Sequence, residues 1–167
     1  NRNVNRNVNR NVNRNVNRNV NWNRTVDIRN TYRHPGWARQ GWGYARPWNF
    51  GWYGGWSSSP PWGWWAARSA LWGITTLATA SIINNAVDSA VAANTRYIVV
   101  PNTSYQLLFG SVQPLGDQSI SFITTAGDTS YQLTADCERG LLEGQTPQSI
   151  QEAELLNAAC QVAFGAV

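Results

Sequence analysis

The side chains that could carry out catalysis are few in this sequence, and they are poorly spaced for it. His34 is the only histidine, and no nucleophile or carboxylate stands at a spacing that would pair with it. The closest carboxylate pairs are Asp136 with Glu138 and Glu152 with Glu154. Either pair could act as an acid–base couple, but solvated surface charge is the simpler interpretation. We therefore expect a protein that is not an enzyme and that holds no cofactor.

The two cysteines, Cys137 and Cys160, lack metal-ligand spacing, and with one histidine they cannot complete a metal site. An even number of cysteines in a small domain favours a disulfide, which by loop entropy would add about 3 kcal/mol to stability. Two buried thiols in a reducing cytosol are the alternative interpretation. Because disulfides persist in oxidising compartments, we expect a secreted protein, extracellular or at the cell surface, from which a signal peptide has been removed.

Two short motifs fit that location. Asn23 and Asn102 each begin an Asn-X-Ser/Thr sequence, the acceptor for N-glycosylation. Such sequons often arise by chance, so their weight comes from the extracellular assignment. We expect a glycoprotein with these two acceptor sites.

Tryptophan and arginine are concentrated in the N-terminal half. All ten tryptophans fall within residues 22–72, and every one of the 13 basic residues is arginine, whose planar charged group stacks on aromatic rings. Between residues 30 and 64 the rings alternate with Gly, Pro and Arg, which is typical of neither a helix nor a strand. The pattern predicts an irregular wrapping segment whose rings pack on a surface. The assembly contacts expected there are Trp37, Trp42, Trp48, Trp52 and Trp56.

Three kinds of ligand would suit this arrangement of rings and arginines. Single-stranded nucleic acid stacks on aromatic side chains along a basic groove, and sugars stack on tryptophan faces. Aromatic and Arg side chains are also the usual anchors of protein interfaces. We favour an interface between copies of this chain, then glycans, and nucleic acid least.

Residues 1–20 are five copies of the tetrapeptide Asn-Arg-Asn-Val. In an extended strand one face would be entirely Asn and the other would alternate Arg and Val, whereas Asn and Val are poor helix formers. Five valines cannot offset the entropy lost on ordering such a chain, so we expect partners to hold it. The assembly residues expected in this arm are Arg2, Val4, Arg6, Val8, Arg10, Arg14 and Arg18.

The charge is divided unevenly along the chain. Residues 1–72 hold eleven Arg and one Asp, a balance of +10, and residues 73–167 hold two Arg against eight acidic residues, a balance of −6. Such asymmetry suggests a basic arm that docks onto something acidic. A head-to-tail contact between the arm of one subunit and the domain of the next would fit.

The C-terminal part reads as an ordinary globular domain. Apolar residues at helical spacing predict a helix from about Trp64 to Ala93, with Gly73 as a weak point. Its uncharged stretch Ser69–Val87 carries too many Thr, Ser and Asn residues for a membrane span, and we expect none.

Strands and a second helix follow. Strands are predicted at Arg96–Val100 and Ser104–Val112, and Ser119–Thr125 with Thr129–Thr134 predicts a hairpin. The pentapeptide Thr-Ser-Tyr-Gln-Leu occurs at 103–107 and again at 129–133, which suggests two strands in equivalent roles. A closing helix follows Thr146-Pro147, with Ser149 and Glu152 at capping-box spacing.

These elements predict an α+β fold, a small mostly antiparallel sheet with a long preceding helix and a C-terminal helix. An extended low-complexity arm lies before it. We divide the chain into the arm, residues 1–22; the wrapping segment, residues 23–63; and a globular domain, residues 64–167.

The globular part also resembles a known group. The stretches WWAARSALWGITTLATASIINNAVDSAV, YIVVPNTSYQLLFGSVQP and AELLNAACQVAFG resemble uncharacterised cyanobacterial secreted proteins, which place a Trp/Gly/Tyr-rich stretch before the same helix. The resemblance covers about 100 residues and not the arm. It implies a bacterial, exported protein and no activity that could be transferred to any residue.

The function we expect is that of a structural subunit of a self-assembling extracellular filament or surface layer, with the arm threading along neighbouring subunits. The alternative is a polysaccharide- or cell-wall-binding module that uses exposed tryptophans. A third hypothesis is an Arg/Trp nucleic-acid binder.

Overall fold

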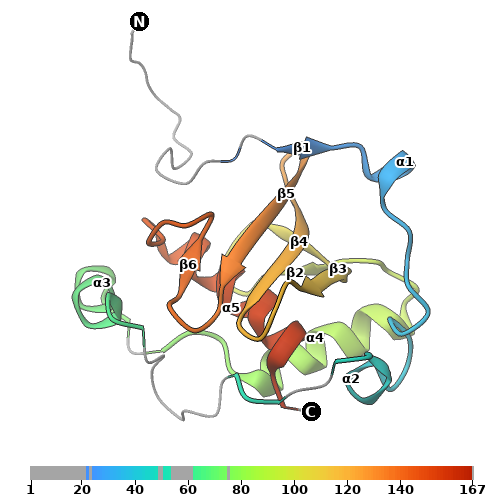
Figure 1. Ribbon diagram of the computed structural model, residues 1–167, viewed down its shortest axis with the longest axis horizontal. Coiled ribbons are helices and arrows are strands. Elements are labelled where there is room, and N and C mark those ends of the chain that lie inside the picture. Colours follow the sequence, from blue (N-terminus) through green and yellow to red (C-terminus); the bar gives the residue numbers. More distant parts are fainter. Residues whose placement is uncertain (1–21, 23, 49–50, 54–61, 75, 167) are drawn as a thin grey trace, which may run out of the picture.

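The computed structural model describes residues 22, 24–48, 51–53, 62–74 and 76–166 (Figure 1). Their strands form one antiparallel sheet. Its strands are β1 (Thr25–Val26), β2 (Ile98–Val99), β3 (Gln106–Pro114), β4 (Ser119–Ala126), β5 (Thr129–Asp136) and β6 (Leu141–Leu142). The order across the sheet is β1-β5-β4-β3-β2, and β6 also pairs with β5. This arrangement confirms the predicted α+β class.

Helices in the described residues lie both before and after the sheet strands. They are α1 (Ile28–Thr31), α2 (Trp42–Ala45), α3 (Trp65–Trp72), α4 (Ala80–Ala92) and α5 (Ile150–Phe164). The single helix expected from 64 to 93 is interrupted. Gly73 ends α3 in the left-handed conformation, with φ at 72°, which glycine adopts without steric cost. Thr79 then caps α4, because its hydroxyl oxygen accepts a hydrogen bond from the backbone N–H of Ile82 at 3.3 Å.

The central hairpin forms where the sequence predicts it. Ala126 pairs with Thr129 across a tight turn in which Gly127 has φ at 64°. The two copies of the repeated pentapeptide enter β3 and β5, the strands on either side of β4. Leu107 of one copy and Tyr131 of the other pair with the same residue, Thr124. The two copies therefore flank the same strand but are offset by two residues, so their matching positions do not occupy equivalent places in the sheet.

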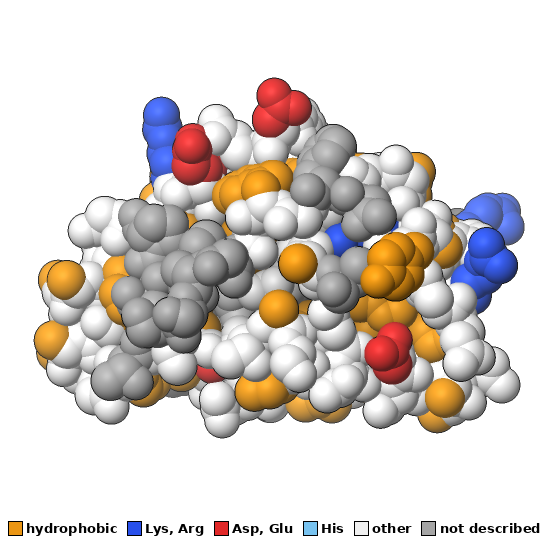
Figure 2. Space-filling model, turned by 90° about the horizontal axis from the view of Figure 1, so that it is seen from below, with side chains coloured by type: hydrophobic (Ala, Val, Ile, Leu, Met, Phe, Trp, Pro, Cys, Tyr) orange, Lys and Arg blue, Asp and Glu red, His pale blue; other side chains and the backbone are white. Residues whose placement is uncertain are grey.

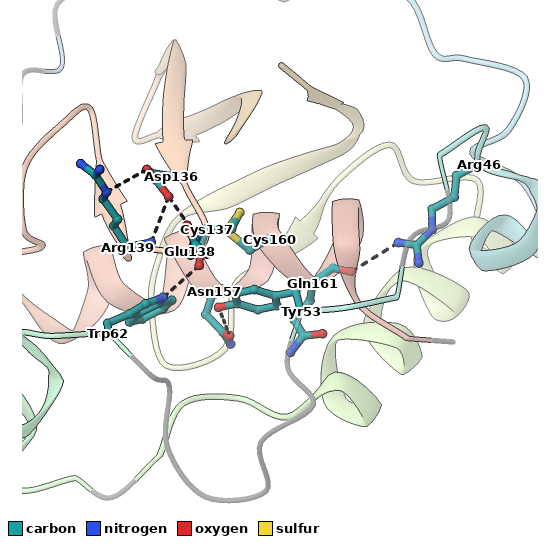
Figure 3. Close-up of a disulfide and its surroundings, with 10 residues drawn as sticks. All are labelled: Arg46, Tyr53, Trp62, Asp136, Cys137, Glu138, Arg139, Asn157, Cys160 and Gln161. Atoms are coloured by element: carbon teal, nitrogen blue, oxygen red, sulfur yellow. Dashed lines mark hydrogen bonds and ion pairs between the residues drawn. A yellow bond between two sulfur atoms is a disulfide. The ribbon is translucent and has the colours of Figure 1, made fainter. Parts of the chain in front are cut away.

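The last helix, α5, is the centre of the molecule. Every residue from Glu152 to Phe164 is buried. Apolar side chains on one face of the sheet, such as Phe109 and Phe122, pack in the same core as α5, and α4 covers another side of that helix (Figure 1). Cys137, which directly follows β5, forms a disulfide with Cys160 of α5 (Figure 3). The predicted cysteine pair thus joins the end of a strand to the central helix.

The wrapping segment belongs to the same core. Trp42, Tyr53 and Trp62 are each no more than 3% exposed and lie in one hydrophobic cluster with α5 and the sheet. The predicted boundary between residues 63 and 64 therefore runs through one shared hydrophobic core. The reason is geometric: a helix buried on all sides needs more cover than the sheet and α4 supply.

Candidate functional site

The tryptophans expected at assembly contacts mostly face their own chain. Trp42 is 2% exposed, and its indole N–H donates to Asp88 Oδ1 at 3.0 Å. Trp37 and Trp48 are half-buried and meet edge to face, with ring centroids 5.3 Å apart. Trp52 is 38% exposed; Trp56 lies outside the described residues. The Trp42 ring is therefore packed in the core of its own chain, and its expected role as an assembly contact stays a prediction.

A second set of rings anchors the wrapping segment beside the disulfide. The indole N–H of Trp62 donates to the carbonyl of Cys137 at 3.0 Å (Figure 3). The indole N–H of Trp64 donates to the carbonyl of Gly140 at 2.9 Å. Gly140 has φ at 72°, and a Cβ there would lie 2.3 Å from the Trp62 ring. Only glycine fits at this point, so the turn after β5 and the ring form one packed unit.

Arg46 closes the C-terminal end of α5. It is 2% exposed, and its guanidinium donates to the carbonyl oxygens of Val162 and Gly165. It also donates to the carbonyl oxygen of Gln161 at 3.4 Å (Figure 3). The last carbonyls of a helix have no partner within the helix and carry partial negative charge. Burial lowers the pKa of Arg46 to about 10, so the group is still protonated at neutral pH. A cation from the wrapping segment thus satisfies a helix end that no water reaches.

Polar side chains on α5 bind the segment before α4. Asn157 accepts a hydrogen bond from the Tyr53 hydroxyl at 2.9 Å and donates to the carbonyl of Ala78 at 2.8 Å. Glu154 accepts from the N–H of Ala78 at 3.1 Å and from the Asn102 side-chain amide at 3.1 Å. Burial raises the pKa of Glu154, and these two donors oppose the rise. The pair Glu152 and Glu154 is therefore structural rather than the solvated surface charge expected from the sequence.

The structure describes one of the two predicted glycosylation sites. Asn102 is exposed, but its side-chain nitrogen, the atom that would carry a glycan, donates to Glu154. Attachment would have to break that contact, and glycosylation there stays a prediction. Asn23 lies outside the described residues.

The arm joins the domain through Trp22, Arg24, Thr25 and Val26, which we call the arm root. The Trp22 ring lies 5.3 Å from the ring of Tyr105 and 5.2 Å from that of Tyr131, the two tyrosines of the repeated pentapeptide. The carbonyl of Arg24 accepts from the N–H of Gln132 at 2.8 Å, which continues the pairing of β1 with β5. The Arg24 guanidinium lies 3.2 Å from a carboxylate oxygen of Glu143. The arm root is thus fixed to one edge of the sheet.

The opposite edge is formed by β2. Val99 is 56% exposed and Tyr97 is 38% exposed. Val100 donates to the carbonyl of Tyr105, and antiparallel pairing alternates, so the backbone N–H and C=O of Val99 point away from β3. Such an edge can accept another strand.

The hollows on the surface of the described residues include the following two. One, of about 570 Å³, lies between the wrapping segment and the outer face of the sheet. Its lining includes Tyr32, Arg33, Trp37, Trp48, Gln113 and Gln132, and we call it the sheet groove. The other, of about 500 Å³, is the α2–α4 pocket. Its lining includes Gln40, Trp42, Tyr44, Asn84, Asp88 and Val91.

His34 has a structural role in the turn before α2. One ring nitrogen lies 3.1 Å from the Tyr32 hydroxyl and the other 2.9 Å from the carbonyl of Ala38.

Among the described residues, no group of three or more His, Cys, Asp or Glu is placed to hold a metal ion. Within that same part of the chain, no helix has the length and apolar character needed to cross a membrane.

Searches against family models, curated proteins and solved structures find no match for this chain. The resemblance to cyanobacterial secreted proteins therefore stays a prediction. The features of the described residues that bear on function are the arm root, the free edge and the two hollows.

Glu152 makes the stability of the protein depend on pH. It is fully buried, and burial raises its pKa from 4.5 to about 7, although the Gln148 N–H, which donates to its carboxylate at 2.9 Å, and the nearby Trp22 indole act to lower it. Between these values the folded chain keeps a proton that the unfolded chain loses. The free energy of unfolding should therefore fall as the pH rises through this window, by on the order of 3 kcal/mol.

Urea unfolding at a series of pH values between 4.5 and 8 measures this effect. Glu152→Gln should flatten most of the slope, with a remainder from Glu154, whose pKa is raised in the same direction. Glu138→Gln is the matched control, because this carboxylate is exposed, and it should leave the slope unchanged. An unaltered slope in Glu152→Gln would show that the buried carboxyl is not the source.

Proposed function

We propose that this chain is a secreted, non-catalytic subunit that assembles with copies of itself through its Asn-Arg-Asn-Val arm into an extracellular filament or surface layer. The observation that carries the proposal is the placing of the arm root at one edge of the sheet, with an exposed apolar strand at the other. An arm that leaves one edge and pairs with the opposite edge of the next subunit makes a heterologous contact. Such contacts repeat without closing and give filaments.

The free edge suits the arm chemically. An added strand would bond to the outward backbone groups of Val99 and alternate its side chains between two faces. One face of the repeat is Asn throughout, and the other offers Val and Arg to the exposed side chains of Val99 and Tyr97. Pairing of this kind would also satisfy the backbone N–H and C=O groups of the arm itself, which supports the proposed assembly.

Charge supports the same contact less strongly than the sequence predicts. Of the eight acidic residues in 73–167, Glu152 and Glu154 are buried, and Glu143 already pairs with Arg24. The acidic surface left for a neighbour's arm is therefore smaller and more local than the balance of −6 implies. Electrostatics would set the register of the arm, while apolar contact supplies most of the affinity.

The disulfide supports the location. A Cys137–Cys160 bond persists in an oxidising compartment, which fits an exported subunit.

Deleting residues 1–20 tests the assembly. The deleted residues precede the arm root, so the shortened chain should fold as before and sediment as a monomer or short oligomer, while the full chain forms long assemblies. A control chain keeps the length and replaces the five repeat arginines by Gln, which separates the role of charge from that of strand pairing. Assemblies of unchanged length from the deleted chain would refute the proposal.

A second candidate function is glycan binding, because the sheet groove has a suitable lining. The half-buried rings of Trp37 and Trp48 offer apolar walls, and Gln113 and Gln132 offer amides that both donate and accept hydrogen bonds. Concave sites with aromatic walls and a few placed polar groups are typical of small-molecule binding.

Binding to an array of neutral oligosaccharides tests this candidate. Gln113→Ala should weaken binding by about fivefold, the effect of roughly one hydrogen bond. Gln118→Ala, an exposed amide outside the groove lining, should bind like the unaltered chain. Equal binding by both variants, or no binding at all, would remove the glycan candidate.

A further inference from the structure

The α2–α4 pocket joins an exposed aromatic ring to a carboxylate. Tyr44 is 76% exposed, and Asp88 faces the same hollow of about 500 Å³ from α4. The residues that line the pocket include no Arg or Lys. Figure 2 shows the molecule from the side of α2 and α4. Most side chains on this side are hydrophobic or uncharged, and the charged ones are few and dispersed. An acidic side chain is therefore one of the few charged groups on this side of the molecule.

Asp88 is held in place but has no cation of its own among the described residues. The Trp42 indole N–H fixes its Oδ1 at 3.0 Å. The ion pairs seen among the described residues include Arg24 with Glu143, Arg29 with Asp27, and Arg139 with Asp136, and none of these three involves Asp88. Because its hydrogen-bond donor is a neutral indole, the Asp88 carboxylate can bind a cation from outside.

The pocket fits arginine better than a simple ammonium ion. A guanidinium is planar, binds a carboxylate through parallel N–H groups and stacks on aromatic faces. The chain already contains one contact of the second kind, since the Arg46 guanidinium lies over the Trp42 ring, 5.3 Å from its centroid. With Tyr44 as the exposed platform and Asp88 as the acceptor, the pocket offers both halves of such a contact.

The sequence contains a matching occupant. The arm supplies an arginine every four residues, each between two asparagines and with valine two positions away. Gln40 and Asn84 offer amides around the pocket, and Val91 offers an apolar contact. The α4 helix then leads through residues 93–97 into β2, so the pocket is continuous in sequence with the free edge of the sheet.

We infer that the α2–α4 pocket of one copy binds an arginine of the Asn-Arg-Asn-Val arm of another copy, with Asp88 as the carboxylate and Tyr44 as the stacking ring. This inference rests on the proposed assembly through the arm and names its receptor. A second copy is the occupant, because the arm root at β1 and the pocket between α2 and α4 lie on opposite sides of the molecule (Figure 1).

The test uses the full chain and follows its self-association by sedimentation over a range of concentrations. Asp88→Asn keeps an oxygen for the Trp42 indole but removes the charge, and it should weaken association at least tenfold. Tyr44→Ala should do the same without risk to folding, because the ring is exposed. Asp117→Asn is the matched control, an exposed carboxylate outside the pocket, and should associate normally.

A peptide of three repeats provides the second readout. Added to the full chain, it should compete with assembly and shift the NMR signal of the Trp42 indole N–H, with neither effect in Asp88→Asn. If Asp88→Asn and Tyr44→Ala assemble normally while deletion of residues 1–20 abolishes assembly, the pocket inference fails and the proposed function stands. If the peptide has no effect, and the Trp42 indole signal of the full chain is shifted equally at every protein concentration, the chain's own arm occupies the pocket. That result would also overturn the inference.

Discussion

The burial of α5 is the constraint on which the rest of the structure depends. A helix covered on every side leaves its last carbonyls without water, and each unsatisfied polar group there would cost about 1–3 kcal/mol. The Arg46 guanidinium binds the carbonyls of Val162 and Gly165. Asn157 and Glu154 then tie Tyr53 and the backbone of Ala78 to the same helix. The sheet, the wrapping segment and α4 are all held by their contacts with this one element.

This constraint decides which residues are left for function. A tryptophan-rich segment looks like a surface for ligands, but Trp42 and Trp62 are core residues, and their indole N–H groups bind partners inside the chain. The surfaces left for recognition are the arm, the β2 edge and the two hollows. Tyr44 and Asp88 illustrate the division, since both stand beside a buried ring but remain exposed themselves. The wrapping segment therefore contributes buried rings to the core and leaves other side chains, such as Tyr44, exposed.

The sequence predicted correctly the turns and helix ends that are determined by residues close together in the chain. The Gly127 turn fixes the hairpin, and Ser149 caps α5 by accepting from the N–H of Glu152 at 3.2 Å. The carboxylate of Glu152, however, accepts from Gln148 rather than from Ser149. Roles that depend on distant contacts were not predictable: Arg46 lies 116 residues from Val162, and no periodicity in the sequence joins them. The prediction of one helix over 64–93 was wrong for a local reason: Gly73 adopts the left-handed conformation and ends α3. This residue is the weak point expected from the sequence.

The most direct test of this account compares the unfolding of two shortened chains. One begins at Trp22 and keeps the wrapping segment, and the other begins at Trp64. Circular dichroism against urea concentration should give a single cooperative transition for the first chain. The second should give none, because it lacks Arg46, Tyr53 and Trp62. A cooperative transition with the same midpoint in the chain that begins at Trp64 would contradict the account, since α5 would then be stable without the cover of the wrapping segment.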